Sequence, residues 1–183
     1  MTPLYIVLGV VVLVILWIVV LYNGLVSLNV RCDEAASDID VQTKRRYDLI
    51  PNLVETVKAY AKHEKGVFEE VTKARTAAMN AKDFADKAQA ENMLSNTLKS
   101  LFAVAEAYPD LKANVNFMQL QEELTATEDK IETSRRYYNG NVRDFNIKIH
   151  RFPEMIFAGM LGFKDRPMFE AAAAEKEAVK VEF

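Results

Sequence analysis

The chain opens with an uninterrupted apolar run from Leu4 to Tyr22, and no charged residue appears before Arg31. Roughly 20 apolar residues in a helix cross the hydrocarbon core of a membrane, so the run has the length of a transmembrane span. A cleaved signal peptide is the alternative. However, the run is too long for one, no basic region precedes it, and no small-residue cleavage pair follows it. The pattern therefore predicts a retained membrane anchor.

Beyond the anchor, apolar residues recur at the three- and four-residue spacing of amphipathic helices. From Leu25 to Tyr47 the chain contains neither proline nor glycine, so we expect the anchor helix to continue this far. Pro51 follows closely, and a proline inside a helix removes a backbone hydrogen bond. We therefore expect a kink or a short break near Tyr47, before a second amphipathic helix.

Further helices are indicated after Gly66. One is expected to end near Met79, and the next is expected to begin at an Asp83 cap and to stop before Pro109. A capping box at Asn116 would open the last long helix.

This last helix, from Phe117 to Arg151, has the most regular pattern in the chain. Apolar residues occupy every seventh position: Phe117, Leu124, Ile131, Tyr138, Phe145 and Phe152. The pair Asn139-Gly140 would normally indicate a turn. Because the seven-residue register continues across it, we expect one helix about 52 Å long.

No strand pattern competes with these helices, so the predicted class is all-α. We expect an N-terminal transmembrane helix followed by a long antiparallel bundle of about four helices. The expected divisions are an anchor at 1–24, a juxtamembrane helix at 25–47, the bundle at 48–165 and a C-terminal tail at 166–183.

Charge limits the partners and suggests an orientation. The 183 residues carry a net charge of −3, without the basic excess of nucleic-acid-binding proteins, so no nucleic-acid partner is expected. Basic residues follow the anchor at Arg31 and at 44–46, and none precedes it. The positive-inside rule therefore favours a single-pass protein of the cell membrane with a cytoplasmic bundle.

The sequence does not indicate a motif for catalysis or for binding a metal or cofactor. His63 is followed by Glu64, but Val67 stands where a zinc-binding H-E-x-x-H motif needs a second histidine. The residues three before His63 and His150 are Tyr60 and Ile147, which does not fit a di-iron bundle. We expect no catalytic residue, no metal and no cofactor.

Long strings of this sequence closely resemble the LemA family of bacterial membrane proteins. The resembling segments are Ser37–Glu64, Leu101–Asn114, Asn116–Leu124, Arg135–Asn139 and Phe152–Pro153. The chain departs from the family's common pattern at Ala36, where a tryptophan is usual, and at Thr43, where a leucine is usual. The resemblance implies an N-terminal single-pass anchor and a helical bundle, and it implies no agreed enzymatic activity.

These observations favour a non-catalytic, membrane-anchored scaffold that self-associates. Anchors in a bilayer hold all copies in one orientation and raise their local concentration. The lipid bilayer and further copies of the chain are the expected partners. Candidate interaction residues are Ala36, Arg45, Arg46, Tyr47, Arg135 and Arg136. The arginine pairs could bind anionic lipid or a partner, or they could form ordinary surface salt bridges.

An enzyme or ligand sensor with a polar pocket inside the bundle is the alternative function. Thr127, Ser134 and Asn141 lie at successive seven-residue steps beside the long apolar seam and would line such a pocket. Small polar residues at this spacing also occur at close helix contacts or on a solvated flank of a helix.

Overall fold

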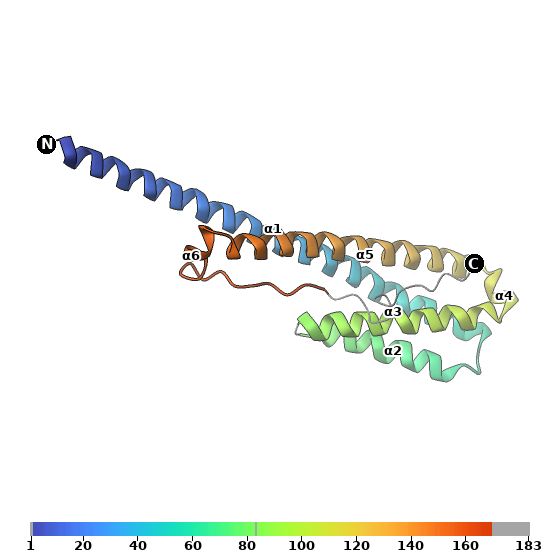
Figure 1. Cartoon of the computed structure of the whole chain (residues 1–183). Coiled ribbons are helices and arrows are strands. Elements are labelled where there is room, and N and C mark those ends of the chain that lie inside the picture. Colours follow the sequence, from blue (N-terminus) through green and yellow to red (C-terminus); the bar gives the residue numbers. More distant parts are fainter. Residues whose placement is uncertain (1, 83, 170–183) are drawn as a thin grey trace, which may run out of the picture. The chain divides into compact units, whose positions relative to one another are not determined.

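The computed structural model describes residues 2–82 and 84–169, and every regular element in this part of the chain is a helix (Figure 1). The helices are α1 (Thr2–Tyr60), α2 (Lys65–Asn80), α3 (Phe84–Glu106), α4 (Pro109–Lys112), α5 (Val115–His150) and α6 (Glu154–Ala158). The predicted all-α class, with one long apolar N-terminal helix followed by helices that pack together, is confirmed.

Two compact units make up the described chain. The first unit contains residues 2–38 and 134–168, and the second unit contains residues 39–133 without residue 83, together with Phe169. The long helices α1 and α5 each contribute one part to each unit.

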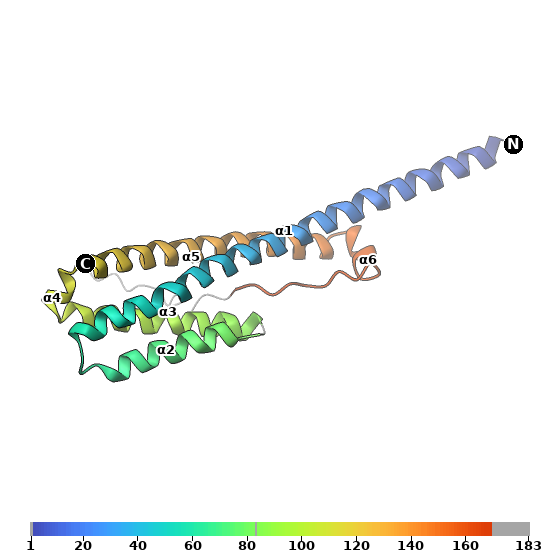
Figure 2. The ribbon, with the colours of Figure 1, turned by 180° about the vertical axis from the view of Figure 1, so that it is seen from behind.

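The second unit is built around an apolar core. α2 and α3 run side by side in it, joined by a short connection, as both ribbon views show (Figures 1 and 2). Apolar residues that recur at three- and four-residue spacing on α1, α3 and α5 are buried in it, in agreement with the amphipathic helices expected from the sequence. Large buried residues of this core include Ile50, Leu53, Phe68, Leu94, Leu98, Leu101, Leu111, Phe117 and Leu124.

The expected break near Tyr47 is wrong, because α1 continues to Tyr60 with Pro51 inside it. Pro51 has no N–H, so it cannot donate to the carbonyl of Tyr47 four residues earlier. Arg75 of α2 supplies a donor instead, with its Nε 2.8 Å from that carbonyl oxygen. A side chain of the neighbouring helix thus replaces the missing helical hydrogen bond.

The start of α5 differs from the expected capping box. The helix begins at Val115, and the Oδ1 atom of Asn114 accepts a hydrogen bond from the backbone N–H of Phe117 at 3.1 Å. The capping role predicted for Asn116 is therefore wrong, since that residue already lies inside the first turn. The predicted cap Asp83 lies outside the described residues.

The long helix α5 passes through Asn139 and Gly140 without interruption, as the register predicted. Five of the six residues in its seven-residue seam are buried. The exception is Phe152, which was expected in the seam and is instead 73% exposed. It lies beyond the end of the helix at His150, so the helical spacing no longer determines where its side chain points.

In the first unit the chain turns at α6 and returns beside α1 and α5 (Figures 1 and 2). The side-chain amide of Asn146 binds the backbone of Arg166 twice, accepting from its N–H at 3.0 Å and donating to its carbonyl at 2.9 Å. The guanidinium of Arg166 in turn binds Asn29 at 2.9 Å and Asp33 at 2.6 Å. The hydroxyl of Tyr138 donates to the carbonyl of Pro167 at 3.0 Å. The first residues of the tail expected at 166–183 are therefore hydrogen-bonded to α1 and α5. Residues 170–183 lie outside the described part.

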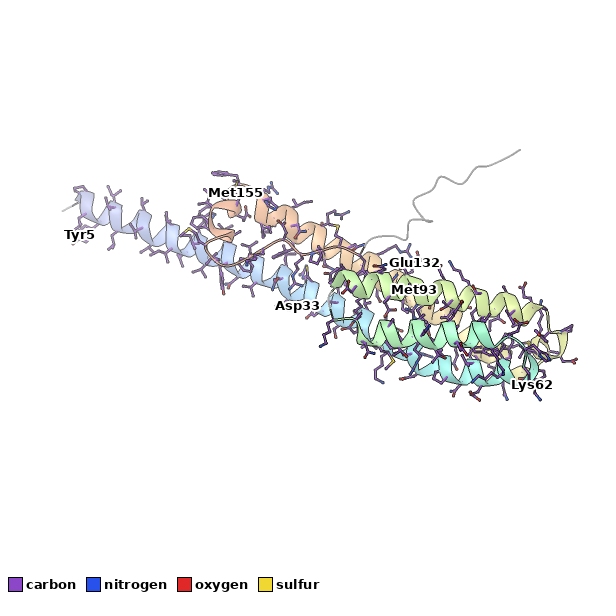
Figure 3. All side chains as sticks on the ribbon, turned by 90° about the horizontal axis from the view of Figure 1, so that it is seen from below. Tyr5, Asp33, Lys62, Met93, Glu132 and Met155 are labelled. Atoms are coloured by element: carbon purple, nitrogen blue, oxygen red, sulfur yellow. The ribbon has the colours of Figure 1, made fainter. Side chains whose placement is uncertain are left out.

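The N-terminal part of α1 is the apolar stretch found in the sequence. It is long and apolar enough to cross a membrane, and none of its most apolar window is buried against the rest of the chain. Figure 3 shows the side chains around Tyr5 projecting from the helix on all sides, with no other element beside them.

Because a hydrogen bond from Arg75 replaces the helical hydrogen bond that Pro51 cannot form, substitutions of these two residues should be energetically coupled. Arg75→Met should lower the free energy of unfolding by about 1 kcal/mol or more, because the Tyr47 carbonyl loses its donor. In a Pro51→Ala background the same substitution should cost less, since residue 51 then has an N–H to donate. The coupling between the two positions should be about 1 kcal/mol.

Chemical denaturation of the full chain in mild detergent, followed by far-UV circular dichroism, measures these differences. Arg143→Met serves as the matched control, because Arg143 is exposed and its side chain pairs with the adjacent Asp144 at 3.4 Å. Equal costs of Arg75→Met with and without Pro51 would contradict the assignment.

Candidate functional site

A cluster of buried charges lies inside the second unit. Arg46 of α1 is fully buried, and its NH1 donates to Glu128 of α5 at 2.6 Å and to Ser95 of α3 at 2.8 Å. Its NH2 forms an ion pair with Glu91 of α3, which is also buried. One guanidinium therefore connects three helices. We call Arg46, Tyr47, Glu91, Ser95 and Glu128 the Arg46 cluster.

Two further hydrogen bonds lie within the Arg46 cluster. The hydroxyl of Tyr47 donates to the carboxylate of Glu91, and the hydroxyl of Ser95 donates to Glu128 at 3.0 Å. Removing charges from water is costly, and a buried pair recovers that cost only with good geometry and additional hydrogen bonds. The guanidinium is a rigid, planar set of N–H donors, so it fixes the directions in which its partners lie. Its chemistry fits a positioning role for the three helices.

The helical periodicity of the sequence contains a signal for this cluster, although the cluster matches no catalytic or metal-binding motif. Glu91 lies three residues before Leu94 and seven before Leu98, on the apolar face of α3. Arg46 lies four residues before Ile50, on the apolar face of α1. A basic and an acidic residue on two buried faces predict a buried ion pair. Only the structure brings Ser95 and Glu128 to the same place.

The six residues predicted as interaction sites divide equally between the two units. In the second unit, Arg46 and Tyr47 are buried, so their side chains are turned inward. Arg45 is half exposed, with its NH2 3.6 Å from Glu123 of α5. In the first unit, Ala36 and Arg135 are half-buried and Arg136 is exposed.

Two of the three residues expected to line the alternative pocket donate hydrogen bonds within their own helix. Thr127 is buried and donates to the carbonyl of Glu123 at 2.7 Å, and Asn141 donates to the carbonyl of Tyr137 at 2.9 Å. A shallow hollow of about 460 Å³ lies along α5. Its lining residues are Met118, Gln121, Glu122, Thr125, Ala126 and Asp129. In the described residues no three His, Cys, Asp or Glu side chains gather as a metal site would require.

Two titratable groups of the first unit are shifted by burial. Burial raises the pKa of the Cys32 thiol, so the thiol stays protonated at neutral pH. Burial likewise raises the pKa of Tyr138, which suits its role as a hydroxyl donor to Pro167. Both groups act as buried, neutral packing residues.

The Arg46 cluster predicts an asymmetry between single and double substitutions. Arg46→Met leaves the buried Glu91 carboxylate uncompensated and should lower the free energy of unfolding by about 3–5 kcal/mol. Arg46→Met combined with Glu91→Met replaces the pair by apolar side chains and should recover most of that loss. Denaturant unfolding of the full-length variants in detergent measures both values. A double variant no more stable than Arg46→Met alone would contradict the pairing.

Comparisons with known proteins place this architecture in a family. Residues 35–183 match the LemA family. The chain is 26% identical over 179 residues to magnetosome protein MamQ 2 of Paramagnetospirillum magneticum, covering 84% of this chain and 66% of that protein. It is 26% identical over 155 residues to protein LemA of Metamycoplasma hominis, covering 84% of this chain and 71% of that protein.

A third relative, magnetosome protein MamQ of Magnetospirillum gryphiswaldense, is 23% identical over 169 residues, covering 78% of this chain and 62% of that protein. The chain thus spans just under two thirds of the length of the MamQ proteins that it matches. Since the family match extends from the juxtamembrane part of α1 to the last residue, this chain belongs to the LemA family.

Proposed function

We propose that this protein is a non-catalytic, membrane-anchored scaffold that self-associates at the membrane. One observation carries the proposal. A single continuous helix, α1, has at one end an apolar stretch whose most apolar window is not buried, and at the other end a face buried in a helical bundle. Such a helix is suited to hold a folded bundle at a membrane.

The exposure of the apolar stretch supports the anchor. The large side chains from Leu4 to Val20 are mostly exposed, although they form one contiguous apolar surface. Exposing apolar area to water costs about 25 cal/mol per Å², and large patches of this kind mark contact with a membrane or another protein. The length of the stretch and the absence of charge before Arg31 favour the membrane.

The enzyme or sensor alternative has no comparable support. Two of the three residues expected to line its pocket, Thr127 and Asn141, donate to carbonyls of α5 itself. Within the Arg46 cluster, the guanidinium of Arg46 pairs with the carboxylates of both Glu91 and Glu128, so these groups are engaged with one another. The relatives named above are called magnetosome or LemA proteins, and neither name describes a reaction.

Self-association is proposed through the outer face of α1 just after the anchor. Ala35 is buried within its own unit, so it is not offered to a second copy, and Ala36 is half-buried. Val30 and Ser37 lie seven residues apart on one side of the helix, and both are exposed. Parallel anchors would bring these faces of two copies together at a high effective concentration.

Ser37→Arg tests this contact without entering the core of the unit. It should shift the full chain toward monomer in native mass spectrometry, both from mild detergent and from nanodiscs, and should leave membrane insertion unchanged. Ser100→Arg is the matched control, because Ser100 is exposed on α3 and should leave the assembly intact. An unsubstituted chain that is monomeric in both media would overturn the proposed self-association.

We further propose that the bundle lies on the cytoplasmic side. Ser100→Cys places a thiol on an exposed position of α3, whereas the native Cys32 is buried. A membrane-impermeant maleimide should label this variant in permeabilised bacterial cells and not in intact ones. The unsubstituted chain reports any labelling of Cys32. Labelling of Ser100→Cys in intact cells would place the bundle outside.

A further inference from the structure

A group of exposed apolar side chains surrounds the turn at α6 in the first unit. Phe152 is 73% exposed and Met160 is 84% exposed, and three large neighbours are also exposed. We call this group the α6 patch; its members are Phe152, Met155, Ile156, Met160 and Leu161. Five such residues in a ten-residue segment form a surface that water does not favour.

The α6 patch lies beside the end of the apolar stretch of α1. Phe157 packs edge-on against Trp17, with their ring centroids 6.1 Å apart. Phe163 lies against Tyr22, with ring centroids 6.2 Å apart. Both ribbon views show α6 next to α1, and Met155 marks this turn in Figure 3. The patch therefore lies level with the last residues of the apolar stretch, within the same unit.

Basic side chains lie close to the end of the apolar stretch of α1. A Cβ atom added at Gly24 would be 3.2 Å from the Nζ of Lys148, so the ammonium group of α5 rests on α1 two residues beyond Tyr22. Arg151 and Lys164 flank the turn and are exposed. Two acids lie in the same segment: Asp165 pairs with His150 at 2.8 Å, and Glu154 at the start of α6 is half-buried. Lysine and arginine at the end of an apolar span bind lipid phosphates and keep their charge in the headgroup layer.

We propose that the α6 patch enters the boundary between headgroups and acyl chains of the same membrane that α1 crosses. The chain then contacts the bilayer at two places, once across it and once along its surface. This inference rests on the proposed function, because it requires α1 to be the anchor.

The depth at which the α6 patch would lie in the membrane agrees with this placement. From Trp17 to Tyr22 the helix rises about 8 Å, and interfacial helices bury their apolar face about 5–10 Å into this boundary. The whole run from Leu4 to Tyr22 rises about 27 Å, close to the thickness of a hydrocarbon core. The α6 patch would therefore occupy only the outer part of one leaflet.

The bilayer fits the α6 patch better than a second copy of the chain does. The patch continues the apolar surface of α1 at Trp17, which would already be in lipid, and the basic groups lie where phosphates would be. An occupying protein would need a matching apolar surface at that depth.

Fluorescence quenching in nanodiscs that contain anionic lipid tests the proposal on the full chain. Ile156→Cys carries an environment-sensitive fluorophore at the centre of the patch. Leu13→Cys places the same fluorophore in the anchor. Val41→Cys places it on an exposed apolar position of α1, about 28 Å beyond Tyr22 along the helix. The unsubstituted chain controls for labelling of the buried Cys32.

We expect spin-labelled lipids to quench the fluorophore at Ile156 and at Leu13, and not at Val41. Iodide in the water should quench Ile156 several-fold less than Val41, and the emission at Ile156 should be shifted to the blue. Equal iodide quenching at Ile156 and Val41, with Leu13 still quenched by lipid, would overturn the α6 contact and leave the anchor intact.

Two other outcomes also decide the matter. Shielding of Ile156 from iodide without quenching by lipid would mean that protein, not the membrane, covers the patch, and would overturn the proposal. Loss of lipid quenching at Leu13 would overturn the anchor itself, and with it both the proposed function and this inference.

Discussion

The guanidinium of Arg46, buried between three helices, constrains how the helices of the second unit align. An apolar core alone tolerates small shifts of one helix against another, because apolar contacts have little directionality. A buried guanidinium does not tolerate such shifts, because a carboxylate that moved away from it would leave a buried charge without a partner. Ion pairing to Glu91 and Glu128 therefore specifies how α1, α3 and α5 align, and the surrounding leucines and isoleucines supply most of the free energy of burial.

Pro51 shows how such alignment supports local structure that the sequence alone disfavours. The cost of a proline inside a helix comes from the lost N–H and from the ring. Arg75 can remove part of that cost only if α2 is held against the turn of α1 that contains Tyr47. Tertiary packing thus preserves a continuous α1 at the point where a local rule predicts a break.

Most of the fold could be predicted from the sequence, because helical periodicity records which face of each helix is buried. The apolar run, the faces that contain Leu53 and Leu98, and the continuity of α5 through Gly140 all follow from spacing. Departures occur where a contact distant in sequence decides the outcome, as at Pro51, or where the helix ends, as at Phe152.

The candidate site was harder to predict. Arg45 and Arg46 were expected together as a surface pair, because two adjacent arginines look alike in sequence. In the structure Arg45 is half exposed and Arg46 is buried, since consecutive residues lie on different sides of a helix.

The bond between Arg166 and Asn29 has a consequence for the order in which the chain becomes structured. The two residues are 137 positions apart, so during synthesis the start of α1 emerges long before the return segment exists. Contacts of such separation form late, because the intervening chain must first be brought together. The juxtamembrane turns of α1 must therefore persist without these partners until nearly all of the described chain has been made. Insertion of the apolar stretch into a bilayer would fix one end of α1 during this interval and give the later segments a helix already in place to fold against.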